Sequence, residues 1–466
     1  MKLRLALLVA VCTLHGSPVL ASTPPMPNWQ QAQEETVRNL TSLVRIDTSN
    51  PPGNETRVAE YMKAILDKEG IPAEIIEMAP GRGNLVARLK GSGKQKPILL
   101  MSHIDVVGVE RDRWSVDPFA AVTKDGYLYG RGVYDDKGMT SANLQVLVML
   151  HRLKVPLDRD VILLAEADEE AGGEAGIKFM IEKHWDKIAC EFALNEGGWI
   201  YEQDGNVQYV GVSTTEKVPR RIRLVAKGTS GHGSMPRPDN AVTHLAAAVA
   251  KLGSMQMPMR LNETTQTFFR RLATISPATE AALYRDLENP GRTTAAQEQM
   301  RLTNIMYNSM LRTSLAPTII KGGFRNNVIP AEAEATIDIR ALPDEDIPKM
   351  VATLRKVIDD PTVEVLPPST EPAPAPSRLG TEMFKALERV QAQVFPGAVT
   401  LPVMLTGATD SAPLRAKGVQ AYGVGSVVTD EERLRIHGND ERLSIAGLGK
   451  FVELLYRSVV EIAATK

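Results

Sequence analysis

The stretch Lys96–Asp105, KPILLMSHID, predicts the fold of this chain. Its short apolar run ends in a histidine and an aspartate, as a buried strand does when it leads into a polar loop. A second run, Asp160–Glu170 (DVILLAEADEE), ends in acidic residues, and the segment between them, Thr140–Lys154 (TSANLQVLVMLHRLK), has helical spacing. Strands that alternate with helices indicate an α/β fold with a largely buried sheet, which binds ligands where its strands end.

The pattern changes at about Pro219. From there, strands and helices follow in the order βαββαβ, which is typical of a small ferredoxin-like domain, and a helical segment at about 255–312 interrupts it. The proline-rich LPPSTEPAPAPS ends this pattern, and α/β character then returns. We therefore expect one α/β domain split in sequence, 22–217 and 369–466, with a ferredoxin-like α+β domain, 218–368, inserted into it.

The composition is that of an ordinary globular protein. Of the 466 residues, 43% are hydrophobic and 24% are charged, and the formal net charge is -2. A chain so close to neutral has no excess of basic residues with which to bind a phosphate backbone, so we expect no nucleic-acid partner.

The first residues, 1–21, MKLRLALLVAVCTLHGSPVLA, have the order of a secretory signal peptide: a basic start, an apolar run and small residues. We expect cleavage after Ala21 and a secreted or periplasmic protein; the alternative is a buried first helix. Cleavage would leave Cys190 as the sole cysteine, and therefore no disulfide. No later run has the length of a membrane span.

Three of the seven histidines lie in settings that suggest chemistry: His103, His232 and His437. His103 ends the run ILLMSH, and Asp105 follows two residues later. Because residues i and i+2 of an extended segment point the same way, Asp105 can accept from the ring nitrogen that His103 does not use on a ligand. The alternative is a buried hydrogen-bonded pair without a metal, and this pair alone does not decide between the two.

Acidic residues follow three further strand-like segments. They are Asp135 and Asp136, Asp168 to Glu170, and Glu196. Scattered as helix caps and in solvated turns they would need no partner, but if they converged they would repel one another unless a cation lay between them. A set of carboxylates and histidines suits Zn²⁺, with Mn²⁺ or Co²⁺ as substitutes.

Seven motifs together carry a resemblance to a known family. In order they are SHIDVV, GRGVYDDKG, DEEAGG, NEGG, SGHGSMP, NNVIPAEAEATIDIR and IHGNDER. Their order and spacing resemble the M20 family of dinuclear zinc peptidases and amidohydrolases, from about Glu35 to the carboxyl end. The resemblance implies that the split α/β domain is catalytic, and that the inserted domain is a lid through which two subunits can form a homodimer.

The resemblance also implies a set of ligands for two Zn²⁺ ions per subunit. His103 and Glu196 would bind one ion, and His437 and Glu170 the other. Asp135 matches the carboxylate that bridges both ions, whereas Asp136 occupies a variable position. In the family the peptide bond after the bridging aspartate is often cis, so we expect a cis bond between Asp135 and Asp136.

Two further residues match catalytic positions of the family. Glu169 matches the general base, and Asp105 the carboxylate that orients the histidine ligand. His232 matches a histidine that donates to the developing oxyanion, often from the partner subunit. On the residues alone, the glycine-rich segment around His232 could equally be a turn.

Three residues match substrate-binding positions. Arg340 and Asn327 resemble residues that hold the substrate's carboxylate and carbonyl, and Gly407 resembles a residue that lies along the substrate. A planar arginine fork suits a carboxylate because it can bond both oxygens. The alternative for Arg340 is a salt bridge within the inserted domain.

We therefore expect a hydrolase that cleaves an amide next to a free carboxylate, in small peptides or N-acyl amino acids. A water that bridges two zinc ions would attack, with Glu169 as the base. This covers a carboxypeptidase or dipeptidase and an amidohydrolase; glutamate at position 196 favours carboxypeptidase or deacylase members. The alternatives are an aminopeptidase of the same family and a non-catalytic metal-dependent binding protein. A structural zinc site would favour cysteines, of which only Cys190 would remain.

Overall fold

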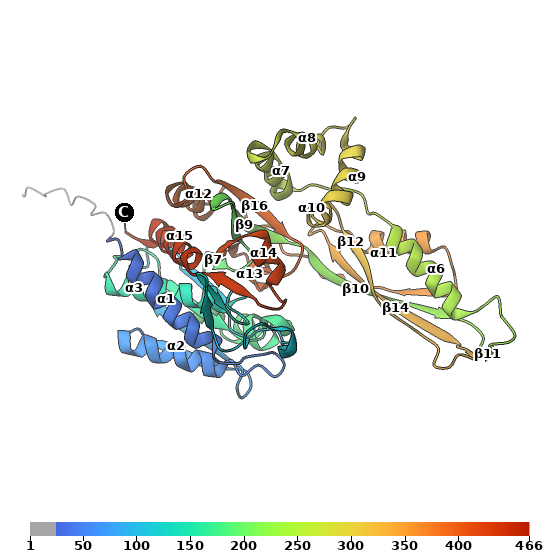
Figure 1. Ribbon diagram of the computed structural model, residues 1–466, viewed down its shortest axis with the longest axis horizontal. Coiled ribbons are helices and arrows are strands. Elements are labelled where there is room, and N and C mark those ends of the chain that lie inside the picture. The colour runs from blue at the N-terminus through green and yellow to red at the C-terminus, as the bar shows by residue number, and fades with distance from the viewer. Residues whose placement is uncertain (1–24, 466) are drawn as a thin grey trace, which may run out of the picture.

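The computed structural model describes residues 25–465, so the predicted signal peptide, 1–21, and its cleavage point lie outside the described residues. The chain forms a broad region and a narrow region, each built on its own sheet (Figure 1). The broad region holds a ten-stranded mixed sheet, and the narrow region holds a four-stranded antiparallel sheet. The fold is therefore of the mixed α/β class that the sequence predicts.

The large sheet contains the two runs that indicated the fold. Its strands, in spatial order, are β1 (Ala73–Glu77), β2 (Gly83–Leu89), β6 (Val161–Glu166), β3 (Ile98–His103), β7 (Phe192–Asn195), β17 (Gln420–Gly423), β9 (Asn206–Glu216), β8 (Trp199–Gln203) and β18 (Val427–Val428), with β16 (Val399–Leu405) beside β9. The neighbouring strands β6, β3, β7 and β17 run parallel. Because parallel strands end on the same side of a sheet, the loops that follow them meet there.

Helices cover both faces of these parallel strands. On one face lie α1 (Trp29–Val44), α2 (Thr56–Glu69), α3 (Lys137–Arg152), α12 (Glu382–Val394) and α15 (Ile445–Ala463); on the other lie α4 (Phe179–Lys183), α5 (Trp185–Ile188) and α13 (Ser411–Ala416). Ile98 and Leu100 pack into the first core, whereas Leu99 and Met101 pack into the second. A strand buried on both faces needs an unbroken apolar run, which is what Lys96–Asp105 contains.

The small sheet has the predicted ferredoxin-like order. It consists of β12 (Ser314–Gly322), β14 (Glu332–Ala341), β10 (Val218–Lys227) and β15 (Val363–Leu366), in that spatial order, with α6 (Ala241–Ser254) and α11 (Ile347–Ile358) packed on one face. The chain order is β10, α6, β12, β14, α11, β15. Ile337 and Ile339 of β14 are fully buried while their neighbours are partly exposed, so only one face of the sheet contributes to the core.

The helical segment predicted at about 255–312 contains four helices: α7 (Glu263–Ile275), α8 (Ala278–Asp286), α9 (Thr293–Thr303) and α10 (Ile305–Met310). Although it follows α6 in the chain, it packs on the large sheet. Phe268 and Phe269 of α7 share a core with Leu401 and Val403 of β16. The segment therefore covers strands of the broad region (Figure 1).

One strand lies elsewhere than in the predicted sheet. The run YLY forms β5 (Tyr127–Tyr129), which pairs with β4 (Val122–Lys124) and β19 (Arg442–Ser444) in a separate three-stranded sheet. This pairing brings the motif GRGVYDDKG next to IHGNDER, which follows α14 (Asp430–Arg435) and leads into β19. The remaining pair, β11 (Gly231–His232) and β13 (Val328–Ile329), lies at the end of the small sheet remote from the large one (Figure 1).

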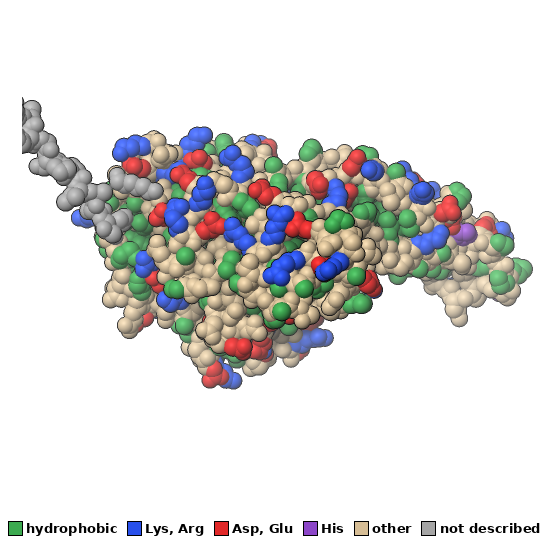
Figure 2. Space-filling view, turned by 90° about the horizontal axis from the view of Figure 1, so that it is seen from above, with side chains coloured by type: hydrophobic (Ala, Val, Ile, Leu, Met, Phe, Trp, Pro, Cys, Tyr) green, Lys and Arg blue, Asp and Glu red, His purple; other side chains and the backbone are tan. Residues whose placement is uncertain are grey.

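The surface has no dominant sign of charge on the face in Figure 2, where acidic and basic side chains are interspersed over the broad region. Within residues 25–465, no helix is both long and apolar enough to cross a membrane. Cys190 is a free thiol.

A buried ion pair joins the large sheet to α13, next to the loop that borders the site described below. Arg415 Nη1 lies 3.0 Å from Glu216 Oε2, and both side chains are almost fully buried. The Glu216 carboxylate also accepts from the backbone nitrogen and the hydroxyl of Thr409, at 3.0 and 2.9 Å. We expect Arg415→Met to lower the free energy of unfolding by about 3 kcal/mol or more, because Glu216 would stay buried without its cation.

Urea denaturation would measure this effect, with Arg389→Met as the matched control. Arg389 pairs with Glu461 at 2.8 Å on the surface, so its loss should cost less than about 1 kcal/mol. Equal effects of the two substitutions would contradict a structural role for the buried pair.

Candidate metal centre and active site

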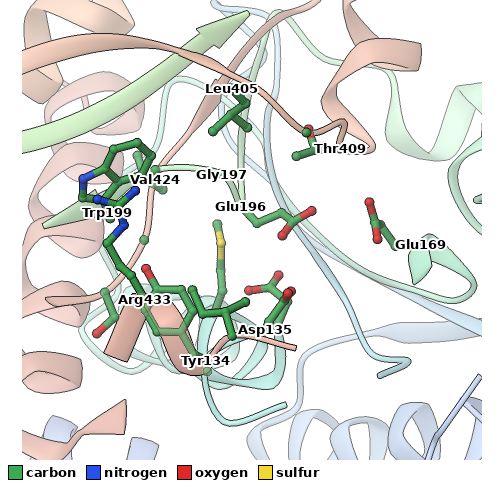
Figure 3. A pocket seen from close by; sticks show the side chains of 18 of the residues that line it. Tyr134, Asp135, Glu169, Glu196, Gly197, Trp199, Leu405, Thr409, Val424 and Arg433 are labelled. Atoms are coloured by element: carbon green, nitrogen blue, oxygen red, sulfur yellow. The ribbon is translucent and has the colours of Figure 1, made fainter. Parts of the chain in front are cut away.

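Acidic and histidine side chains meet where the parallel strands end. His103 is the last residue of β3, Glu169 and Glu170 follow β6, and Glu196 follows β7. Asp135 comes from the loop before α3. Figure 3 shows Asp135, Glu169 and Glu196 directed toward a common space. The convergence that the strand ends predicted is therefore present.

His103 is oriented by Asp105. Its Nδ1 lies 3.1 Å from the Asp105 carbonyl oxygen and 3.3 Å from Asp105 Oδ1. This leaves Nε2 directed at Asp135 Oδ1, at 3.0 Å, with Glu196 Oε2 at 3.9 Å. Both His103 and Asp105 are buried, so the ring is held in one orientation, with Nε2 as the nitrogen that can bind a ligand.

Asp135 faces a histidine with each of its two oxygens. Oδ1 faces His103, and Oδ2 lies 2.9 Å from His437 Nε2. The same His437 nitrogen lies 3.1 Å from Glu170 Oε1. Each histidine therefore faces one oxygen of Asp135 and lies near one glutamate, which is Glu196 for His103 and Glu170 for His437.

These donor atoms lie close enough together to hold a cation. Ligand atoms of His103, Asp135 and Glu170 lie within 4.8 Å of one another, as do those of His103, Glu169 and Glu196, so both groups include His103. Histidine nitrogens and carboxylate oxygens suit divalent zinc and its substitutes.

The acid–base properties of the site follow from burial and from these contacts. Burial and the neighbouring acids raise the pKa of Glu169 to about 8, and burial also raises the pKa of Glu196. Burial would raise the pKa of Asp135, but His103 and His437 hold it below its usual range. The contacts with Asp135 and Glu170 raise the pKa of His437 to about 10. Without cations, the site therefore holds protons at neutral pH.

Asp105 also shapes the loop that carries Glu169 and Glu170. Its two carboxylate oxygens accept from the backbone nitrogens of these residues, at 3.1 and 3.2 Å. Asn50 Nδ2 donates to Asp105 and Asp168, at 2.8 and 3.0 Å. The carboxylate of Glu169 itself makes no hydrogen bond or ion pair within residues 25–465, so it is free to exchange a proton.

A second network joins the loops of Asp135 and His437. Glu441 accepts from the backbone nitrogens of Tyr134 and Asp135, at 2.9 and 3.2 Å, and pairs with Arg131 at 2.7 Å. Arg131 also donates to the carbonyl oxygen of Gly438, at 2.8 Å. The arginine of the GRG motif and the glutamate of the motif IHGNDER thus hold the loops of Asp135 and His437 together.

The peptide bond between Asp135 and Asp136 is cis, as predicted. Asp136 stands at the N-cap position of α3, but its side chain caps no backbone nitrogen there. It is buried beside the cluster, and burial raises its pKa well above the usual range.

A cavity of about 340 Å³ opens next to the cluster. Tyr134, Trp199, Leu405 and Val424 contribute apolar walls (Figure 3). Gly407 lies in the wall, where it was predicted to accompany the substrate. A substrate in this cavity would contact both the acidic cluster and an apolar surface.

The family model of Peptidase family M20/M25/M40 matches residues 99–461. The chain belongs to this family. The human N-fatty-acyl-amino acid synthase/hydrolase PM20D1 is 28% identical, over 92% of this chain and 87% of its own length. The probable carboxypeptidase S-like 2 of Dictyostelium discoideum is 32% identical, over 81% of this chain and 74% of its own. The M20 family metallo-carboxypeptidase Sso-CP2 of Sulfolobus solfataricus has a similar fold, with a TM-score of 0.67 at 19% identity, covering 91% of this chain and 98% of its own.

Three residues that the M20 resemblance assigned to the site lie outside the cavity of this subunit. His232 and Asn327 are exposed at the remote end of the small sheet, where Gly233 N donates to the Asn327 carbonyl oxygen at 2.8 Å. Arg340, on β14, pairs with Asp338 at 2.9 Å, which is the salt bridge that the sequence left as the alternative. Residues of this region could reach the cavity only through a different arrangement or from another subunit.

Several residues of this M20 site were not predicted from the sequence. Glu441, Arg131 and Tyr134 stood inside quoted motifs, so their place in a motif was the available signal. Trp199 and Arg433 gave none, because only the fold brings these two to one cavity.

The raised pKa values predict that metal binding releases protons. At pH 7 His437 and Glu169, with pKa values of about 10 and 8, each hold a proton in the metal-free protein. A cation must displace the proton of His437 to bind its nitrogen, so affinity for Zn²⁺ should rise with pH from about 6 to 9.

Titration calorimetry in two buffers of different ionisation enthalpy would measure the protons released. His437→Ala should release fewer protons than the parent protein. A binding enthalpy that is the same in both buffers would contradict this picture.

Proposed function

We propose that this chain hydrolyses the amide bond of N-acyl amino acids or small peptides, next to a free carboxylate, with two Zn²⁺ ions bound. The observation that carries the proposal is the arrangement of Asp135, each of whose oxygens faces a different histidine, beside the unpaired carboxylate of Glu169. His103, Glu196, Asp135, His437 and Glu170 would hold the cations. When bound, these would acidify a water and polarise the amide carbonyl.

The residues of the chain supply the proton transfers. Glu169 accepts a proton from the attacking water and returns it to the leaving amine, and its free carboxylate beside the cluster suits both steps. Asp105 keeps the backbone of Glu169 in place through the hydrogen bond at 3.1 Å. The apolar walls at Tyr134, Trp199 and Val424 favour substrates with an apolar group beside the amide. The name of the human relative, an N-fatty-acyl-amino acid synthase/hydrolase, also suggests such substrates.

We also propose that His232 acts from the partner subunit of a homodimer. Ser234 N donates to His232 Nδ1 at 3.1 Å, so the neutral ring carries its proton on the exposed Nε2, as an oxyanion donor requires. The adjacent edge strand β12 exposes Ile319 and Ile320, 49% and 60%, which supports burial against a second copy. The predicted signal peptide would place this enzyme outside the cytoplasm, as a secreted or periplasmic protein.

Glu169→Gln should lower kcat by roughly 10²- to 10⁴-fold, because the water would lose its base, while the bound zinc stays unchanged. The assay would use N-acyl amino acids and dipeptides, each also blocked at the amino or the carboxyl end, with zinc measured on the same sample. Glu174→Gln is the matched control, because Glu174 begins the next helical turn of the chain but pairs with Lys178 at the surface. Full activity in Glu169→Gln would contradict the mechanism, and a requirement for a free amine would instead identify an aminopeptidase.

A mixing experiment tests His232. His232→Ala and Glu169→Gln subunits should each be nearly inactive alone, but unfolded and refolded together they should regain part of the activity, because one site of the mixed dimer has both residues. An inactive mixture would contradict action across the dimer.

A further inference from the structure

The cavity beside the metal centre has an unusual charge distribution. Among the described residues that line it, Arg433 is the one arginine, and there is no lysine. The same lining contains five carboxyl groups, those of Asp135, Asp136, Glu169, Glu170 and Glu196. These would be the cation ligands and their neighbours, and those that are ionised repel an anion until cations neutralise them. A substrate carboxylate in this cavity therefore has one permanently charged side chain to pair with.

The guanidinium of Arg433 is held in position without being neutralised. Its Cζ lies 4.8 Å from the centroid of the Trp199 ring, and Nη2 donates to Met306 Sδ at 3.1 Å. Trp199 is itself fixed, because its indole nitrogen donates to the Tyr209 hydroxyl at 3.2 Å. No carboxylate among residues 25–465 lies within 4.0 Å of the Arg433 nitrogens. Since a thioether is a weak acceptor, most of the guanidinium donors stay available.

Arg340 does not compete for this role in the arrangement observed. It pairs with Asp338 on the small sheet and does not line the cavity. Figure 3 shows Arg433 and Trp199 at one side of the cavity and Asp135 and Glu196 at the other, with Tyr134 between them. A substrate whose amide lies at the carboxylate cluster would extend toward Arg433 along the apolar wall.

We infer that Arg433, stacked on Trp199, binds a carboxylate of the substrate inside this cavity and is a specificity-determining residue. The inference rests on the function proposed above. The planar fork of a stacked arginine is preset to bond both oxygens of a carboxylate. The carboxylate is either the one beside the scissile amide or one at the far end of the acyl group, because both place the same anion in the cavity.

Three amide substrates separate these sources. N-octanoyl-leucine has its carboxylate beside the amide, N-octanoyl-leucinamide has none, and a leucinamide acylated with one end of octanedioic acid has it at the far end. Arg433→Met should raise KM by roughly 10- to 100-fold for whichever of the two carboxylate substrates the parent enzyme cleaves, with little change in kcat. It should leave the KM of N-octanoyl-leucinamide unchanged. Arg433→Lys should restore part of the affinity.

Arg457→Met is the matched control, because Arg457 stacks on Trp29 at 5.4 Å, outside the cavity. Thermal unfolding of each variant reports whether it is folded. If both Arg433→Met and Arg433→Lys leave every KM unchanged while the parent cleaves these amides, the inference is wrong and the proposed function stands. A parent enzyme that cleaves none of the N-acyl or peptide substrates would overturn the proposed function and, with it, this inference.

Discussion

Repulsion between carboxylates is the constraint on which the rest of this structure depends. Asp135, Glu169, Glu170 and Glu196 come from three separate loops and meet with two histidines in one space. Burial and the neighbouring carboxylates raise the pKa of Glu169 and Glu196, which is the cost of this convergence in the absence of cations. Bound divalent cations would remove that cost, and the same charges would then serve hydrolysis.

The chain holds this arrangement through contacts with the backbone. Asp105 accepts from the nitrogens of Glu169 and Glu170, and Glu441 accepts from those of Tyr134 and Asp135. Each network fixes a loop before any ligand binds, so the donor atoms need little rearrangement. This role in holding the loops explains why Asp105 and Glu441, which would bind no cation, are buried beside the carboxylates that would bind one.

Local sequence predicted the part of the site that depends on strand ends. A buried strand shows as an apolar run, so the loop after β3 and the loop after β6 could be placed, and the pattern of the small sheet gave its βαββαβ order. The assignment of individual ligands came from the family motifs. Positions that depend on contacts between distant parts of the chain were not predictable from local sequence. β5 pairs with β19 and not with the large sheet, and α7 packs on β16. For the same reason Arg433 gave no signal, and His232 and Arg340 lie outside the cavity to which their motifs assigned them.

The central claim is that Asp135 bridges two cations, and anomalous diffraction from crystals grown with Zn²⁺ tests it most directly. The account predicts two zinc peaks, one beside His103 and Glu196 and the other beside His437 and Glu170, with one Asp135 oxygen on each. A single peak, or two peaks of which one does not contact Asp135, would contradict it.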